Sequence, residues 1–510
     1  MSISSPSEAL NEAGQIEDLK KQLHWAHLKI QLLEDRLRLQ RIAKYGPGSE
    51  KLNSTQLQLL ELEPGVSNAE VRAESEREPL PANAARTDRK KRKHPGRQDF
   101  PAGLPRVEKT IGCAPEHCHC RSCGKETSVI GYAESEQLDL EPAKYLVLVT
   151  KREKRACQHC PDAGVATAQL PARIVDKCLV SNRIVIDTIV AKYSDHLPLY
   201  RQSAILARET GIDISRATMD GWVMHVGDLL IPIAAAMRSE LLQGNYMQAD
   251  ETPVDVQLHN GSGRNHQAYL WQYGRPSGSV VFDFRLGRAR EGPKQFLGNF
   301  EGILQTDGYA AYEGVGGPKM THAACWAHAR RKFVDVLKLN PGDKVASRIV
   351  ASIDALFAID AQARDGNLTL AARYLLRVEQ SAPLLERIKC QIEEALAGAL
   401  PSSALAKAAK YTLTLWKKLT RILEYPELEL STNLAENSMR PIAIGRKNWI
   451  HIGSEKAGPK VAAILSVIES CRRLKISARD YLAAVLPGLA DTSVQRISGL
   501  TPAAWAARSR

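Results

Sequence analysis

Five short runs of β-type sequence dominate the middle of this 510-residue chain and constrain its fold more than any other feature. They are rich in β-branched and aromatic residues and are bounded by turn-forming residues, which predicts strands. The runs are Tyr246–Ala249, Gln267–Tyr273, Ser279–Arg285, Gly302–Thr306 and Thr321–Trp326. A helical segment near Pro293–Leu297 lies between the third and the fourth run. The middle of the chain therefore combines strands and a helix in one unit.

Three strands, a helix and two further strands are the element order of an α/β ribonuclease H-like core. From Ala327 to about Tyr425 the sequence is Ala- and Leu-rich with few turn signals, which predicts helices. We therefore expect the core to occupy residues 245–335 and 431–470, on either side of an all-helical insertion. The insertion takes residues 336–430, and a C-terminal helical tail takes residues 471–510.

Length and charge bound what surrounds this core. A chain of 510 residues exceeds the size of one hydrophobic core, so several domains are expected. Lys and Arg total 69 against 57 Asp and Glu, and the net charge of +12 favours a polyanionic partner, either nucleic acid or an anionic membrane. No stretch approaches the roughly 20 apolar residues of a membrane helix, and no signal pattern begins the chain. We expect a cytoplasmic protein without a membrane partner.

The first 52 residues predict a coiled coil. Apolar residues recur with the seven-residue spacing of two seam positions, namely Ile16, Leu23, Ile30 and Leu37 at one and Leu19, Ala26, Leu33 and Gln40 at the other. We expect homo-oligomerisation through this seam, because a seam of this kind is buried only by a partner helix. The alternative is an amphipathic helix that packs on its own globule.

Residues 53–106 predict a flexible linker, since few apolar groups are present to offset the entropy of ordering. The linker contains a dense basic run, Arg89–Arg97. Such a run is either a solvated segment or a cationic arm that neutralises phosphates, and both can hold together. On the second interpretation Arg92 and Arg97 contact DNA.

Residues 107–170 predict a zinc-binding module. Six of the ten cysteines lie between Cys113 and Cys160, and clustering in a large cytosolic chain is typical of metal binding. Two CxxC pairs, Cys120 with Cys123 and Cys157 with Cys160, flank two β-type runs, Glu136–Leu140 and Tyr145–Thr150. Four thiolates close a tetrahedral structural Zn²⁺ site. Two alternatives stay open: Cys118 in place of Cys120, and six unligated thiols.

Residues 171–244 predict a helical, helix-turn-helix-like region. Helical periodicity covers Ile184–Tyr193, Leu199–Arg208 and Ser215–Gly227, with Gly211 in the second turn and Ser215 as a helix cap. Two helices joined by a turn with Gly have the outline of a DNA-binding motif, in which Arg201 and Arg216 would contact DNA. Ordinary helix packing is the alternative.

Three carboxylates stand where divalent metals could be held for phosphodiester chemistry. Asp250 ends the first predicted strand, and Asp307 ends the fourth, which neighbours it in the expected sheet. Glu436 lies on a predicted helix with Asn433 and Arg440 on the same face. Such chemistry needs hard oxygen ligands for two ions roughly 4 Å apart, and Mg²⁺ or Mn²⁺ suits them.

Further side chains near these carboxylates are candidate DNA contacts. They comprise Trp326, His328, Arg330, Arg331, Arg440, Arg446 and Lys447. The cations would position phosphates, and Trp326 could stack an extruded base. Cys325 and His328 form a CxxH pair, but two ligands are too few to predict a further metal site.

Seven segments carry a family resemblance over nearly the full length. They are Tyr45–Leu52, Lys192–Arg201, Ala249–Pro253, Gln305–Tyr312, Cys325–Phe333, Asn433–Pro441 and Gly445–Trp449, together with the paired cysteines. Through them the chain resembles the insertion sequence 66 family of DDE transposases, although Asn437 and Ser438 stand where Arg and Ala are common.

The resemblance implies that Asp250, Asp307 and Glu436 are the catalytic triad of a bacterial, nucleoid-associated enzyme. That enzyme would cleave the terminal inverted repeats of an element and join them to target DNA, with small accessory proteins of the same element as further partners. Two alternatives stay open. One is a zinc-stabilised DNA-binding regulator derived from a transposase, and the other is a ribonuclease H-like nuclease that cuts without joining.

Overall fold

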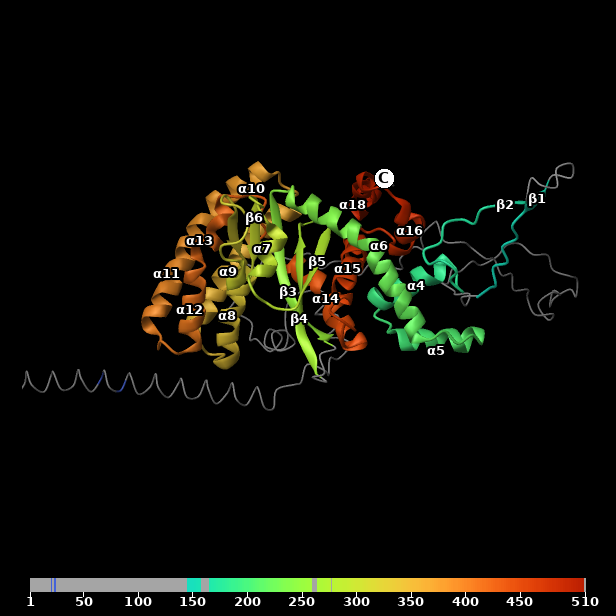
Figure 1. Cartoon of the computed structure of the whole chain (residues 1–510). Helices are drawn as coiled ribbons and strands as arrows, with labels where there is room; N and C mark the ends of the chain where they lie inside the picture. Colours follow the sequence, from blue (N-terminus) through green and yellow to red (C-terminus); the bar gives the residue numbers. More distant parts are fainter. Residues whose placement is uncertain are drawn as a thin grey trace, which may run out of the picture. The chain divides into compact units, whose positions relative to one another are not determined.

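The structure is a computed structural model that describes residues 145–156, 165–258, 264–276 and 278–508, together with Lys20 and Leu23 (Figure 1). The predicted coiled coil, apart from these two residues, and the linker with Arg92 and Arg97 lie outside the described residues. So do all four cysteines predicted to bind zinc, Cys120, Cys123, Cys157 and Cys160.

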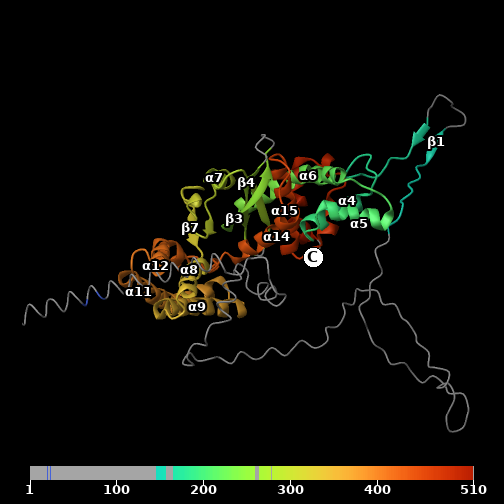
Figure 2. The ribbon, with the colours of Figure 1, turned by 90° about the horizontal axis from the view of Figure 1, so that it is seen from below.

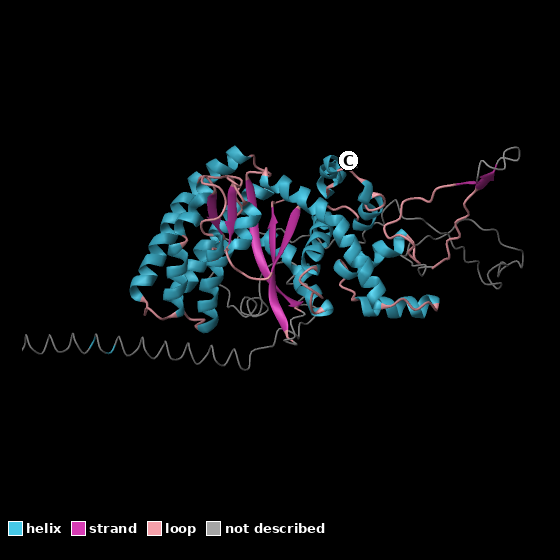
Figure 3. Ribbon diagram, viewed as in Figure 1, coloured by secondary structure: helices cyan, strands magenta, loops and turns pink. Residues whose placement is uncertain are grey.

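A five-stranded mixed sheet lies at the centre of the described residues (Figure 3). Its strands are β3 (Tyr246–Gln257), β4 (Asn265–Gly274), β5 (Val280–Arg285), β6 (Ile303–Thr306) and β7 (Thr321–Ala324), in the order β5-β4-β3-β6-β7. The β3–β4 and β4–β5 pairs are antiparallel, whereas the β3–β6 and β6–β7 pairs are parallel. Helix α7 (Glu291–Leu297) connects β5 to β6. All five predicted strands and this helix are confirmed.

Strand β3 is longer than predicted, and only its first part pairs with β6. Gln248 is its last residue paired with β6, and from there to Gln257 the strand pairs with β4. Pro253 lies in this second part, where a missing N–H costs no bond to β6. Side chains alternate along the strand, so Gln248 and Asp250 share one face and Glu251 lies on the other.

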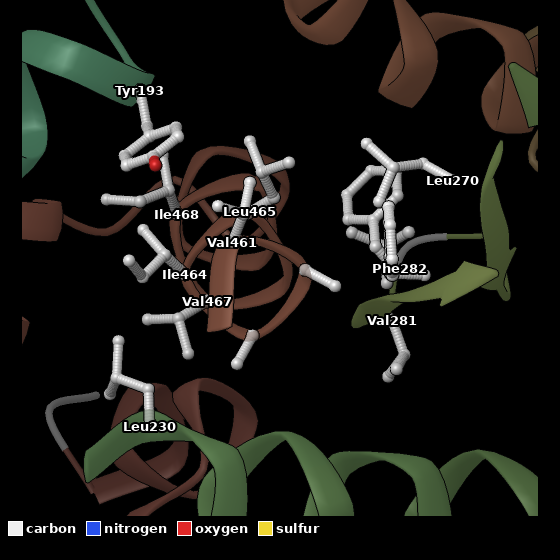
Figure 4. Packing of buried hydrophobic residues seen from close by; sticks show 14 of the residues in the cluster. Tyr193, Leu230, Leu270, Val281, Phe282, Val461, Ile464, Leu465, Val467 and Ile468 are labelled. Carbon is white, nitrogen blue, oxygen red and sulfur yellow. The ribbon is translucent and has the colours of Figure 1, made fainter. Parts of the chain in front are cut away.

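Helix α15 (Ala457–Arg473) covers the edge of the sheet at β5. Ser470 and Ser466 Oγ accept the backbone N–H groups of Val280 and Phe282, at 2.9 and 2.8 Å. These bonds satisfy an edge that would otherwise be open to another strand. Figure 4 shows the apolar side chains of α15 packed between residues of the sheet, such as Phe282, and residues of the preceding helices, Tyr193 and Leu230.

Three helices of the described residues precede the sheet: α4 (Asn182–Tyr193), α5 (Leu199–Thr210) and α6 (Arg216–Leu242). Gly211 ends α5 with a φ of 72°, and Ser215 Oγ accepts the N–H of Thr218, as the predicted turn and cap require. The prediction that α6 stops near Gly227 is wrong. The helix continues through Pro232 because its later turns bury Leu230 and Ile233, and α6 packs on α15.

The segment between β7 and residue 431 is helical, as predicted (Figure 2). Its buried residues form a core together with Tyr246, Ile303, Ala323 and Ala324 of the sheet. Its elements are α8 (Trp326–Leu339), α9 (Lys344–Asp365), α10 (Leu370–Leu376), η4 (Arg377–Ser381), α11 (Ala382–Gly398), α12 (Ala404–Thr414), α13 (Trp416–Leu419) and η5 (Thr420–Leu423). Both α13 and η5 contact β7, so the insertion adjoins the edge of the sheet opposite α15.

The chain returns to the sheet with α14 (Asn433–Trp449), which contacts β3 and β4. After α15, the predicted helical tail contains α16 (Ala478–Val485), η6 (Leu489–Asp491), α17 (Val494–Ile497), η7 (Ser498–Leu500) and α18 (Pro502–Arg508). No helix in the described part of the chain is long and apolar enough to cross a membrane.

One strand prediction before the sheet is wrong. Tyr145–Thr150 has no regular structure, and its apolar side chains are exposed. No strand of the described residues pairs with this segment, and β propensity alone does not produce a strand. The hairpin forms further on instead, where β1 (Lys154–Ala156) pairs antiparallel with β2 (Val165–Thr167).

Candidate active site

Asp250 and Asp307 lie level with one another at neighbouring strands. The parallel register pairs Gln248 of β3 with Gln305 of β6, and each aspartate stands two residues further along. Because side chains two residues apart share a face, both aspartates project on the face of the two glutamines. The predicted strand order placed the two aspartates only at the same edge of the sheet. The observed register of β3 and β6 places them level with one another.

A buried hydrogen-bond network lies behind these aspartates. Gln305 Oε1 accepts the Tyr246 hydroxyl at 2.7 Å and Gln248 Nε2 at 3.0 Å. Gln305 Nε2 donates to the Glu429 carbonyl at 2.7 Å, and Gln248 Nε2 donates to the Ser431 carbonyl at 3.0 Å. Residues 429–431 end the insertion, so the network fastens the start of α14 to both aspartate-bearing strands.

Glu436 lies in the first turn of α14, with only 11% of its side chain exposed. Its two oxygens face His328 Nε2 at 3.5 Å and an Arg331 Nη at 3.6 Å, both on α8. Burial lowers the pKa of His328, but its interaction with the Cys325 side chain and the charge of Glu436 together raise this pKa to about 9. Glu436 is therefore held between two cationic groups of the insertion.

The three carboxylates share one electrostatic environment. Burial, and then the charges of Glu251, Glu436 and Asp307, raise the pKa of Asp250 to about 8. Excess negative charge of this kind is what a divalent cation relieves, and carboxylate oxygens suit Mg²⁺ or Mn²⁺. Glu436 Oε1 is moreover buried without a hydrogen-bond partner. The donor set therefore fits a hard cation.

The side chains are not assembled into a ligand cage. Within the ranges that the structure describes, no group of three or more His, Cys, Asp or Glu side chains is arranged to hold a metal ion. One oxygen of Asp250 accepts the N–H of Glu251 at 2.9 Å, and one oxygen of Asp307 accepts that of Tyr309 at 2.8 Å. Glu436 is engaged with α8, and uncompensated like charges hold carboxylates apart.

A fourth carboxylate, Glu251, was missed by sequence reasoning. Arg288 donates to its Oε1 at 2.6 and 3.0 Å, and the Tyr312 hydroxyl donates to its Oε2 at 2.9 Å. Arg288 also stacks over the Tyr309 ring, 4.0 Å from its centroid. These contacts fasten β3 to the turn after Asp307. The sequence signal that could have indicated these contacts is the i, i+3 spacing of Tyr309 and Tyr312 after Asp307.

The prediction that Trp326 stacks a DNA base conflicts with the burial of its side chain. Its side chain is 0% exposed, its Nε1 donates to the Leu419 carbonyl at 3.0 Å, and Trp416 packs edge-on against it. An indole fixed in this way offers no face to a base. Its position directly after a strand suggested a surface role, but α8 begins at this residue and buries it in the insertion core.

The predicted cationic contacts among the described residues fall into three groups. Arg446 bonds Thr252 Oγ1 at 2.9 Å as well as the Pro253 carbonyl, and Arg330 pairs with Asp354 at 2.5 Å, so both hold the fold together. The side chains of Arg440 and Arg331 are partly buried, and that of Arg331 faces Glu436. The exposed ones are Arg201, Arg216 and Lys447.

A sequence model described as "Transposase IS66 family" matches residues 177–460, more than half of the chain and all of the sheet with its insertion. The chain belongs to this family. The predicted resemblance is thereby confirmed. A model described as "Transposase C of IS166 homeodomain" matches residues 32–108 of this family member, and one described as "zinc-finger binding domain of transposase IS66" matches residues 117–161. The latter range spans all four predicted zinc ligands and also Cys118.

Relatives of this transposase-family chain occur in Sinorhizobium fredii (strain NBRC 101917 / NGR234). The uncharacterized protein y4qI is 32% identical over 502 residues, which covers 94% of this chain and 89% of the relative. The uncharacterized protein y4jD is 32% identical over 454 residues, with coverages of 84% and 87%. The uncharacterized protein y4hP is 29% identical over 507 residues, with coverages of 94% and 88%. The match thus extends along nearly whole chains.

Proposed function

We propose that this chain is a DNA transposase that cleaves the ends of an element and joins them to target DNA in a metal-dependent reaction. Its sheet would be a ribonuclease H-like core. In support, three strands run in antiparallel pairs, α7 follows, and β6 and β7 add in parallel beside β3. This is the element order expected for that core.

The observation that carries the proposal is the shared position of the three carboxylates. Asp250 and Asp307 each stand two residues beyond the paired Gln248 and Gln305 of the parallel strands β3 and β6, and the charge of Glu436 acts on Asp250 from a helix that returns after the insertion. We assign all three as ligands of Mg²⁺ or Mn²⁺. Bound ions would activate the attacking oxygen and stabilise the leaving oxygen of the phosphodiester.

The protein's own groups prepare this site in two ways. The Gln248–Gln305 network fixes the strands and the start of α14 relative to one another. His328 and Arg331 lie opposite the two oxygens of Glu436 and hold this carboxylate in place beside the sheet. Glu251 has both oxygens engaged by Arg288 and Tyr312, and it therefore acts as a positioning residue.

The other parts would bring DNA and a second chain to this site. We propose a self-associating coiled coil at residues 1–52, a basic linker at 53–106 and a zinc module at 107–170 held by Cys120, Cys123, Cys157 and Cys160. The helical region 171–244 would contact the element ends, and its exposed Arg201 and Arg216 support that role. Element-encoded accessory proteins would be further partners.

The test uses the purified full-length chain, Mg²⁺ and a labelled duplex carrying the element's terminal inverted repeat, with a second duplex as target. We expect nicked ends and joined products. Cleavage that never yields joined product would instead identify a nuclease. Sequence-specific binding without any cleavage would identify a DNA-binding regulator.

A further inference from the structure

A hollow of about 310 Å³ opens beside the turn that follows Asp307. It is formed by that turn and by one side of α12, and its lining residues are Gly308, Lys407, Lys410, Tyr411, Thr414 and Leu415. None of the residues on α12 was predicted to have a functional role. The hollow therefore places part of the helical insertion directly next to the candidate active site.

The hollow is tied to Asp307 by close contacts. The Tyr411 hydroxyl donates to the Asp307 backbone carbonyl at 2.6 Å. Gly308 has a φ of 91°, and a Cβ at this position would come within 2.6 Å of Leu415 Cδ1. Only glycine combines this backbone with this approach. A group held in the hollow would thus lie one residue from a proposed metal ligand.

Three exposed lysines lie around this hollow. Lys407 and Lys410 are exposed one helical turn apart, and α12 itself contains no acidic residue. Across the described residues, neither lysine has an ion pair with a carboxylate, whereas the nearby Lys418 pairs with Glu313. Lys332 of α8 adds a third exposed cation, 5.2 Å from the centroid of the Tyr411 ring.

We propose that this hollow binds the sugar-phosphate backbone of the DNA strand that passes through the active site. The three ammonium groups would neutralise phosphates, while the Tyr411 ring, Leu415 and the aliphatic parts of the lysines contact a sugar or base. A strand of nucleotides offers both kinds of group. The inference rests on the proposed function, because it takes DNA as the substrate. Such contacts position DNA without reading its sequence.

The test measures DNA binding by the full-length chain without added divalent metal, so that cleavage does not contribute. The probe is a fluorescent duplex of the element end that carries a single-stranded extension. Affinity is recorded against salt concentration for wild type, for Lys407→Ala with Lys410→Ala, and for Lys407→Arg with Lys410→Arg. Log affinity falls as log salt rises, and each lost phosphate contact makes this negative slope shallower by about 1.

We expect the alanine pair to reduce this slope by about 2 and the arginine pair to retain it. The control is Lys294→Ala with Lys344→Ala, two exposed lysines of α7 and α9 outside the hollow, which should keep the wild-type slope. An unchanged slope for the alanine pair overturns the proposal. So does an equal loss in the control pair, because the effect then follows net charge alone.

A separate cleavage assay in Mg²⁺ distinguishes this inference from the proposed function. If wild type never cleaves but the slopes change as expected, the hollow binds DNA and the proposed enzyme activity is wrong. If wild type cleaves and the slopes do not change, the enzyme stands and the hollow has been misassigned.

Discussion

Gln248 of β3 donates its side-chain N–H to Gln305 Oε1 of β6 at 3.0 Å, directly behind the two aspartates that follow on the same strands. Both glutamines are buried. Gln305 also donates to the Glu429 carbonyl, and Gln248 also donates to the Ser431 carbonyl. The helical insertion thus leaves the sheet after β7 and is fastened again just before Glu436. This pair fixes the start of α14, which carries the proposed ligand Glu436, relative to the two strands that precede the aspartates.

Replacing Gln305 by Leu should lower the free energy of unfolding by about 1–3 kcal/mol, because buried partners lose their bonds. Cleavage should fall as well, since the start of α14 is no longer fixed. Chemical denaturation and an end-cleavage assay measure the two effects. Gln362→Leu, on the exposed side of α9, is the matched control and should change neither. Wild-type stability in the Gln305 variant would contradict the role given to this network.

The insertion contains a buried ion cluster that fixes the same return segment. Asp360, 2% exposed, pairs with Arg373 and Arg377 at 3.0 and 2.7 Å. Arg377 also donates to the Leu428 carbonyl at 2.6 Å, and Arg373 pairs with Glu429 at 3.2 Å. The cluster therefore connects α9 and η4 to the residues that precede Glu436.

Asp360→Asn should lower the free energy of unfolding by about 3–5 kcal/mol, because two arginines lose their buried counter-charge. Denaturation followed by circular dichroism measures this change. Asp354→Asn on the same helix breaks the pair with Arg330, in which the Asp354 side chain is 41% exposed. That control should cost less than about 1 kcal/mol. Equal losses in the two variants would show that the cluster does not contribute as argued.

The same aspartate predicts a pH dependence. Burial alone would raise the pKa of Asp360, but Arg377 and Arg373 hold it below its ordinary value. A carboxyl with a lowered pKa stabilises the fold above its unfolded pKa of about 4 and loses that contribution as pH falls through the folded value. The stability difference between wild type and Asp360→Asn should be complete at pH 7 and shrink only below about pH 4. A difference that already shrinks between pH 7 and pH 5 would contradict this assignment.

The zinc module predicts one Zn²⁺ per chain. Cys120→Ser and Cys157→Ser should each lose the ion, because a structural site needs all four ligands. Metal analysis of the purified full-length chain decides this point. Cys118→Ser is the control and should retain zinc. Loss of zinc in the Cys118 variant, with retention in the Cys120 variant, would select the other register.

The strands were predictable because their sequence pattern is local. β-branched and aromatic runs with turn residues at their ends predict strands wherever a partner strand is available, as for β4 and β5. Tyr145–Thr150 has the same pattern, but no strand in the described part of the chain pairs with it. In α6, the prediction ended the helix at Gly227, yet packing on α15 outweighs the local cost of Gly227 and Pro232.

The charged residues of the candidate site could be predicted because they stand in recognisable motifs. Residues whose role depends on burial could not. Asp250, Asp307 and Glu436 stand in distinct motifs, so their convergence could be expected from strand order. Buried polar partners such as Gln305 have no signature in a single sequence, because any glutamine is usually exposed. Trp326 shows the opposite error, since its helix and its burial become evident only with the insertion folded around it.

The most direct test of the central claim is end cleavage in Mg²⁺ by Glu436→Gln, Asp250→Asn and Asp307→Asn. Each change keeps side-chain size but removes one charge from the proposed metal site. Folding and DNA binding should persist, and cleavage and joining should fall by at least about 100-fold. Glu455→Gln, an exposed carboxylate beyond the end of α14, should cleave like wild type. Near wild-type cleavage by the Glu436 variant would contradict the assignment of the third ligand and, with it, the proposed active site.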